Sequence, residues 1–162
     1  MGTSIDVPID LFLRRIEKDK SFFEYYNLLD FEALALARQR AENFLEEAIY
    51  KVTTQCSPQV DFLLRDGNGD FTFDWNAQEK DLIPSVMYEV YLDRDFAYLK
   101  TLNVNFTSTE LKVFDPSNAR STFLDIYERV HKHNQILMAL YKDTDRETGE
   151  LKQVDFSKYD FS

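Results

Sequence analysis

The segment DFEALALARQRAENFLEEAIYKVTTQ, residues 30–55, carries the clearest helical pattern in the chain. It is rich in Ala, Leu, Glu and Arg, which are among the strongest helix formers. Its apolar residues recur three and four positions apart, so they share one face of a helix: Leu34, Ala37, Ala41, Phe44, Leu45 and Ala48. Several of these side chains are small and permit close packing. The segment therefore predicts a long core helix, which Pro58 ends.

Three further helices are predicted around this one. Residues 5–19 begin with Asp6 and Pro8, which suit a helix start, and place apolar residues at helical spacing. Residues 76–102 open on Asn76 and Glu79, spaced as a capping box, and contain Pro84, which should kink the helix or delay its start. Residues 115–143 open on an Asp-Pro pair typical of a helix N-terminus.

The period changes in VDFLLRDGNGDFTFDW, residues 60–75. Phe71, Phe73 and Trp75 alternate with polar residues, which is a strand signal, and a Gly/Asn/Asp tip separates them from a second apolar arm. We therefore expect a mainly α fold, a four-helix-type bundle with a small β-hairpin and extended terminal arms. Residues 1–145 form one domain with the hairpin near 60–75, and residues 146–162 form an extended C-terminal arm.

The hairpin tip also resembles a calcium loop. Asp66, Asn68 and Asp70 stand at the first, third and fifth positions of such a loop. Phe71 occupies the position that requires Gly, and Ala77 the position that requires a bidentate Glu. A hairpin turn is favoured, and a calcium-binding module at Asp66–Asp74 remains an alternative.

Composition narrows the range of functions. The 162 residues are 44% hydrophobic and 15% aromatic, enough for one domain with a core. The net charge of −10 disfavours binding to nucleic acid phosphates or anionic membranes. Cys56 is the only cysteine, so no intrachain disulfide is possible. No leader peptide or membrane span is recognised, and a cytoplasmic origin is expected.

The sequence offers no familiar catalytic or cofactor pattern. It has no nucleophile elbow, phosphate loop or zinc-ligand spacing, and His131 and His133 project in nearly opposite directions from a helix. We expect neither enzymatic activity nor a cofactor. The aromatic residues instead suggest contacts with partner proteins, and the candidates are Phe22, Tyr25, Tyr26, Phe71, Phe73, Trp75, Phe156, Tyr159 and Phe161.

Three segments in this order resemble a known family. They are the Ala-rich helix, the stretch FTFDWNAQEKDLIPSVMYEVYL, and LKVFDPSNARSTFLDIYERVHKHNQILMALYKDTDRETGELK. Together they resemble the head–tail connector, or adaptor, proteins of tailed bacteriophages over roughly residues 30–150. The matching features are Phe73 to Leu82, Met87, KVFDPSN at residues 112–118, and Tyr141. Pro84 departs from the family, in which this helix is smooth.

The resemblance implies a structural virion protein located in the neck, with the host cytoplasm as its place of assembly. Such proteins form a homo-oligomeric ring, typically of twelve copies, below the portal protein. The ring extends the DNA channel without sequence-specific binding and docks the next neck or tail protein, with no role for a membrane. A soluble helical regulatory or binding protein remains an alternative.

Overall fold

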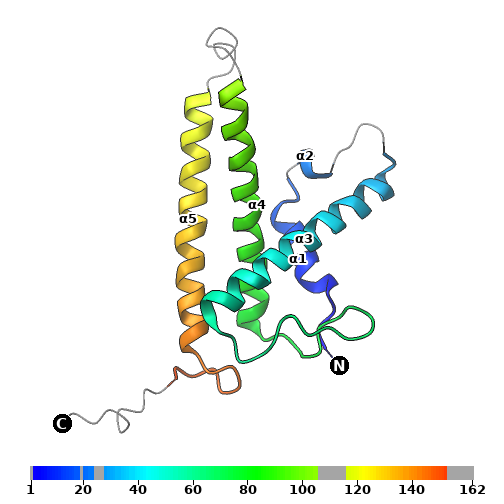
Figure 1. Ribbon diagram of the computed structural model, residues 1–162, viewed down its shortest axis with the longest axis vertical. Coiled ribbons are helices and arrows are strands. Elements are labelled where there is room, and N and C mark those ends of the chain that lie inside the picture. The colour runs from blue at the N-terminus through cyan, green and yellow to red at the C-terminus, as the bar shows by residue number, and fades with distance from the viewer. Residues whose placement is uncertain (1, 19, 24–27, 106–115, 153–162) are drawn as a thin grey trace, which may run out of the picture.

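The computed structural model describes residues 2–18, 20–23, 28–105 and 116–152, which are mainly helical (Figure 1). The helices are α1 (Asp6–Arg15), α2 (Lys20–Phe23), α3 (Asp30–Cys56), α4 (Ala77–Asn105) and α5 (Pro116–Asp143). The predicted mainly α class is confirmed. Within the described ranges no strand is present, so the structure does not contain the expected β-hairpin there.

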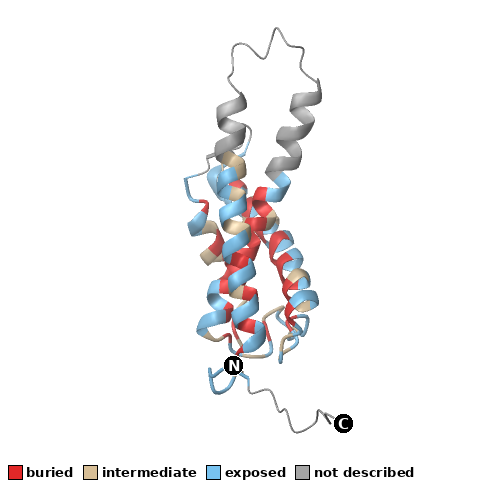
Figure 2. Cartoon of the chain, turned by 90° about the vertical axis from the view of Figure 1, so that its left-hand side faces the viewer, coloured by how far each residue is buried: buried red, intermediate tan, exposed pale blue. Residues whose placement is uncertain are grey.

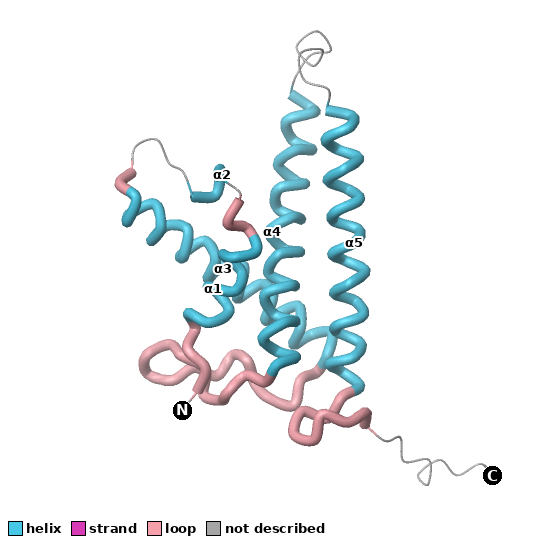
Figure 3. Tube along the Cα trace, turned by 180° about the vertical axis from the view of Figure 1, so that it is seen from behind, coloured by secondary structure: helices cyan, strands magenta, loops and turns pink. Residues whose placement is uncertain are grey.

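The helices α4 and α5 form an antiparallel pair, and α3 crosses one part of it (Figures 1 and 3). The short helix α1 packs on both α3 and α4. The far end of the α4–α5 pair extends beyond the level of α3 in both views. The shape is therefore a compact base from which two helices project.

The alanines of α3 let it approach its neighbours closely. Ala37, Ala41 and Ala48 are fully buried, as are Phe44 and Leu45, so the predicted stripe faces the core (Figure 2). Leu34 is the exception, because its side chain is 51% exposed. Burying each large side chain stabilises the fold by roughly 1.5–3 kcal/mol.

An aromatic cluster joins the first two helices to the core. The Phe12 ring lies edge-on to Phe22, Phe44 and Tyr91, at centroid distances of 6.2, 5.7 and 6.1 Å. Such contacts add about 0.5–1.5 kcal/mol per pair beyond area burial. The cluster buries Phe22, which we expected at a partner surface.

The start of α4 follows the predicted capping box. The Glu79 backbone N–H donates to Asn76 Oδ1 at 2.9 Å, and the Asn76 N–H donates to Glu79 Oε2 at 2.8 Å. These bonds satisfy two amides that lack partners within the helix. The helix begins at Ala77 and continues through Pro84, so the proline does not delay its start.

A turn replaces the predicted hairpin between α3 and α4. Arg65 and Phe71 form one isolated antiparallel bridge, and Asp66 Oδ1 accepts bonds from the N–H groups of Asn68 and Asp70. Pairing stops there because Phe71 and Trp75 turn into the core, where their ring centroids are 4.5 Å apart. The period-two pattern reflected burial and not strand pairing.

The N-terminal residues occupy the place that a second strand would have taken. Thr3 N donates to Phe73 O and Thr3 O accepts from Phe71 N, both at 3.0 Å. Thr3 Oγ1 accepts from Trp75 N at 2.8 Å, and Asp70 Oδ1 accepts from Ser4 Oγ at 2.9 Å. The first residues therefore hold the turn segment against the core.

The chain after α5 also differs from the expected extended arm. Residues 144–152 form a turn in which Thr144 bridges Leu151 and Lys152 N donates to Asp143 O at 2.7 Å. The Asp145 side chain accepts from the amides of Glu147 and Thr148, at 3.0 and 2.9 Å. The part of the expected arm from 146 to 152 is thus folded, and the rest lies outside the described residues.

The close approach of Gly2 to the turn segment gives a first prediction. A Cβ at Gly2 would stand 1.5 Å from the Phe71 carbonyl oxygen, so Gly2→Ala must displace the N-terminal residues. We expect a loss of about 2 kcal/mol in unfolding free energy, since several net hydrogen bonds of about 1 kcal/mol each are disturbed. Urea unfolding followed by circular dichroism measures it.

The matched control is Gly67→Ala, because a Cβ there meets nothing within 4 Å. It should change stability by less than about 0.5 kcal/mol. Equal effects of the two substitutions would show that the N-terminal residues do not support the fold.

Candidate functional site

The residues predicted to contact partners separate into three groups. Phe22, Phe71 and Trp75 are buried in the core, so this prediction is corrected: their side chains are not exposed for a partner. Phe73 is partly buried against the same core. The other candidates lie outside the described residues: Tyr25, Tyr26, Phe156, Tyr159 and Phe161.

The calcium-loop candidates do not converge on one point. Asp66 accepts from the amides of Asn68 and Asp70, as an Asx turn does. The Asp70 carboxylate turns away to Ser4 Oγ and the Ile5 amide, at 2.9 Å each. In the part of the chain that the structure describes, no three His, Cys, Asp or Glu side chains are grouped to hold a metal ion.

The first buried polar cluster surrounds Glu79, whose side chain is fully buried near the start of α4. Its Oε1 accepts from Arg146 Nε at 2.7 Å and from the Tyr141 hydroxyl at 3.0 Å. Its Oε2 accepts from Arg146 Nη2 at 3.2 Å and from the Asn76 amide. A buried carboxylate requires such partners, because an unpaired buried charge costs several kcal/mol.

Arg146 connects this cluster to the rest of the base. Its guanidinium also donates to Asp74 O, and its backbone N–H donates to Gln59 Oε1 at 2.7 Å. The guanidinium carbon lies 5.1 Å from the centre of the Phe73 ring, within cation–π range. One side chain after α5 thus joins the α3–α4 connection to the start of α4.

Two pKa shifts reflect this arrangement. Burial, with the neighbouring Glu79 carboxylate, raises the pKa of the Tyr141 hydroxyl above its ordinary value, so Tyr141 stays protonated and donates. Hydrogen bonds from the Thr148 backbone and the Gln59 side chain lower the pKa of Asp145 to about 2. The turn after α5 therefore keeps its ionised Asp145 over the physiological range.

The second buried cluster surrounds Glu89, two to three turns further along α4. Glu89 Oε1 lies 2.8 Å from Lys51 Nζ on α3 and 2.6 Å from His131 Nδ1 on α5, and Oε2 accepts from Asn134 Nδ2 at 2.7 Å. The same Asn134 accepts from Ser85 Oγ at 2.6 Å. The cluster joins α3, α4 and α5 through one carboxylate.

Opposing effects act on the pKa of Glu89. Burial raises it, and hydrogen bonds from His131, Lys51 and Asn134 lower it by more, so the net shift is downward from 4.5. Glu89 therefore stays ionised in the folded protein at neutral pH.

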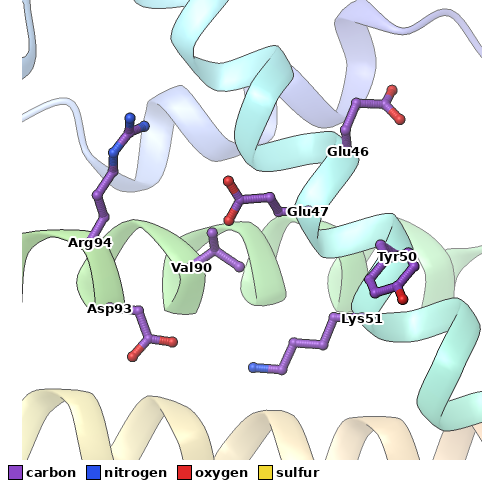
Figure 4. A pocket seen from close by; sticks show the side chains of 7 residues that line it. All are labelled: Glu46, Glu47, Tyr50, Lys51, Val90, Asp93 and Arg94. Carbon is purple, nitrogen blue, oxygen red and sulfur yellow. The ribbon is translucent and has the colours of Figure 1, made fainter. Parts of the chain in front are cut away.

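An open groove of about 710 Å³ lies between α3 and α4, beside the Glu89 cluster (Figure 4). Its lining carries charges of both signs: Glu46, Glu47, Tyr50, Lys51, Val90, Asp93 and Arg94. Lys51 is paired with Glu89, Glu46 pairs with Arg65 at 2.9 Å, and Arg94 lies over the Phe44 ring. This mixed lining does not select one class of ligand.

Burial, together with a hydrogen bond to the groove residue Asp93, raises the pKa of Tyr127 to about 12.

Neither cluster was predicted from the sequence, although signals for both were present. Glu79 and Glu89 fall on the same helical face as Leu82 and Val86, which places carboxylates in an apolar stripe. Asn134 stands likewise at helical spacing from the apolar residues Val130, Leu137 and Tyr141 of α5. A polar residue on a core face indicates a buried partner, but its partner cannot be named without the fold.

Comparisons with protein-family models, with curated proteins and with solved structures give no match to this chain. Among the described helices, none combines the length and apolar character that a membrane span requires.

The pairing of Glu79 with Arg146 gives a second prediction. Glu79→Gln keeps the size of the side chain and one acceptor oxygen, but it removes the charge opposite Arg146 and places an NH2 donor where Tyr141 or the Asn76 amide now finds an acceptor. We expect a loss of about 3 kcal/mol in unfolding free energy, because a largely buried cation loses its counter-charge. Urea unfolding at pH 7 measures it.

The control for this charge removal is Asp81→Asn, which breaks the exposed Arg15–Asp81 pair of 3.0 Å. An exposed pair is worth less than about 1 kcal/mol. If both variants lost the same small amount, Glu79 would not be a central support of the fold.

The Glu89 cluster gives a third prediction, on pH. Its folded-state pKa lies below 4.5, so its contribution to stability is complete above that value and is lost as the pH falls through the folded-state pKa. Glu89→Gln should cost about 2 kcal/mol at pH 7. The difference from wild type should shrink toward pH 3, as followed by denaturant midpoints.

The exposed Glu150→Gln serves as control and should show no such pH-dependent difference. A gap between wild type and Glu89→Gln that stayed constant from pH 7 to about pH 3 would contradict the assignment.

Proposed function

We propose that this chain is a structural head–tail connector of a tailed bacteriophage, which forms a ring below the portal and extends the DNA channel. The resemblance in sequence order supports this proposal. The matching features are Phe73 to Leu82, Met87 and Tyr141, together with the segment KVFDPSN at residues 112–118, most of which lies outside the described residues.

The observation that carries the proposal is that these features belong to one structural unit. Leu82 and Met87 are buried in the core, and the Tyr141 hydroxyl bonds to Glu79, between Phe73 and Leu82 in the sequence. Arg146 lies over Phe73 and completes the unit. The residues that carry the resemblance in sequence therefore pack together, and this supports the proposal.

The shape and charge are compatible with a ring around DNA. A compact base with two projecting helices offers separate surfaces for neighbouring copies and for proteins above and below (Figure 1). With a net charge of −10, acidic side chains facing a channel would repel phosphates and let DNA slide. In this function the buried carboxylates support the fold and take no part in catalysis.

The fourth prediction tests this function. The chain is co-expressed with the portal protein encoded in the same genome, and the purified complex is imaged by electron microscopy. We expect a ring of this chain, of twelve copies by the resemblance, on one end of the portal.

The control is co-expression of the portal with an unrelated acidic helical protein under the same conditions, and this portal should stay bare. Purification of the chain free of the portal, as a monomer or dimer, would contradict the proposal and favour a soluble binding protein instead.

A further inference from the structure

A second groove, of about 410 Å³, lies where α1 meets the α4–α5 pair, and we call it the α1–α5 groove. In Figures 1 and 3, α4 lies between α1 and α5, so α4 forms the floor and the other two helices form the walls. The volume falls within the range of about 300–1,000 Å³ that is typical of sites for small ligands. Six side chains line the groove: Arg15, Ser85, Tyr88, Arg129, Val130 and His133.

The walls of this groove are rich in N–H donors. A guanidinium carries five such donors, and Arg15 gives one of them, on Nη2, to Asp81 Oδ1 at 3.0 Å. Arg129 is exposed and has no hydrogen bond or ion pair to another described residue. His133 adds one ring N–H in either neutral tautomer. Donors that line a groove and lack protein acceptors suit an oxyanion such as a carboxylate or a phosphate.

Two carboxylates stand close to the groove without lining it. Asp81 pairs with Arg15, and the exposed Asp125 precedes Arg129 by one helical turn on α5. The formal charge around the groove is therefore close to balanced. An anion is held there by direct hydrogen bonds from the two guanidiniums and not by a general basic field.

The groove also offers an apolar surface in a fixed position. Tyr88 and Val130 are half-buried, and the Tyr88 ring stacks on Tyr91 with the centroids 6.1 Å apart. Ser85 is 2% exposed, and its hydroxyl donates to Asn134 Oδ1 at 2.6 Å, which ties the floor to the second buried cluster. Such a surface favours a ligand with an apolar body, and its rigidity lowers the entropy cost of binding.

We propose that the α1–α5 groove binds an oxyanion, either a carboxylate or a phosphate, that is carried on an aromatic or other apolar group. Arg15 and Arg129 donate to the anion from opposite walls, and the apolar body packs on Tyr88 and Val130. A guanidinium donates two parallel bonds to such an anion, which fixes the orientation of the ligand. The proposal goes beyond the connector function and does not depend on it.

Titration of the nitrogen-15-labelled chain at constant ionic strength tests the site, with amide NMR shifts as the readout. The probes are phenyl phosphate and benzoate, and benzyl alcohol is the neutral control. We expect one or both anions to give saturable shifts at Ser85, Tyr88 and Val130, and the alcohol to give none. The net charge of −10 repels anions in general, so a saturable response reports a specific site.

Two substitutions assign the response to the groove. Arg15→Gln and Arg129→Gln should each weaken binding by about tenfold, because each removes hydrogen bonds to a charged group. The matched controls are Arg14→Gln on α1 and Lys132→Gln on α5, which change exposed cations that do not line this groove. Both controls should bind like wild type, and all four variants should keep the dispersed amide spectrum of a folded chain.

The relative affinities of the two anions identify the source of the ligand. Tighter binding of phenyl phosphate supports a phosphorylated small molecule, and tighter binding of benzoate supports a carboxylate. The proposal is overturned if neither anion gives saturable shifts, if the shifts map outside the groove, or if both arginine variants bind like wild type. Inorganic phosphate that binds as tightly as phenyl phosphate would also overturn it, since the groove would then hold an adventitious ion only.

Discussion

The buried carboxylate of Glu79 is the constraint on which the rest of the base depends. A fully buried charge is tolerated only where donors surround it, and here they come from Arg146, Tyr141 and the Asn76 amide. Tyr141 and Arg146 stand 62 and 67 positions away along the chain. Satisfying this one group therefore holds the end of α5, the turn after it and the start of α4 in a single arrangement.

The Glu89 cluster repeats this solution further along α4 and adds α3 to it. Apolar side chains alone allow two helices to slide past each other at small cost, whereas a buried polar network is satisfied in one register only. We interpret the pairs Glu89–Asn134 and Glu79–Tyr141 as fixing the register of α4 against α5 at two heights.

Much of the helical architecture was predictable from local pattern. The alanine stripe of α3, the capping box of α4 and the proline at the start of α5 are signals that operate within a few residues. The predictions that were wrong concern a segment in which the burial of side chains, and not strand pairing, sets the apolar pattern. The alternation of apolar and polar residues in FTFDW was interpreted as a sign of strand pairing, but Phe71 and Trp75 alternate with polar residues because they enter the core. The backbone groups of Phe71 and Phe73 form hydrogen bonds with Thr3 near the N-terminus instead.

The sequence by itself determined a mainly α chain, the approximate limits of its long helices and its acidic character, because these follow from periodicity, capping and composition. Only the tertiary structure decided which aromatic residues are buried, which carboxylates are paired and which apolar residues remain at the surface. Leu34 and Ala37 belong to one predicted stripe, yet the first is exposed and the second buried. That difference depends on which residues of distant segments cover each position of α3, and no local pattern contains those contacts.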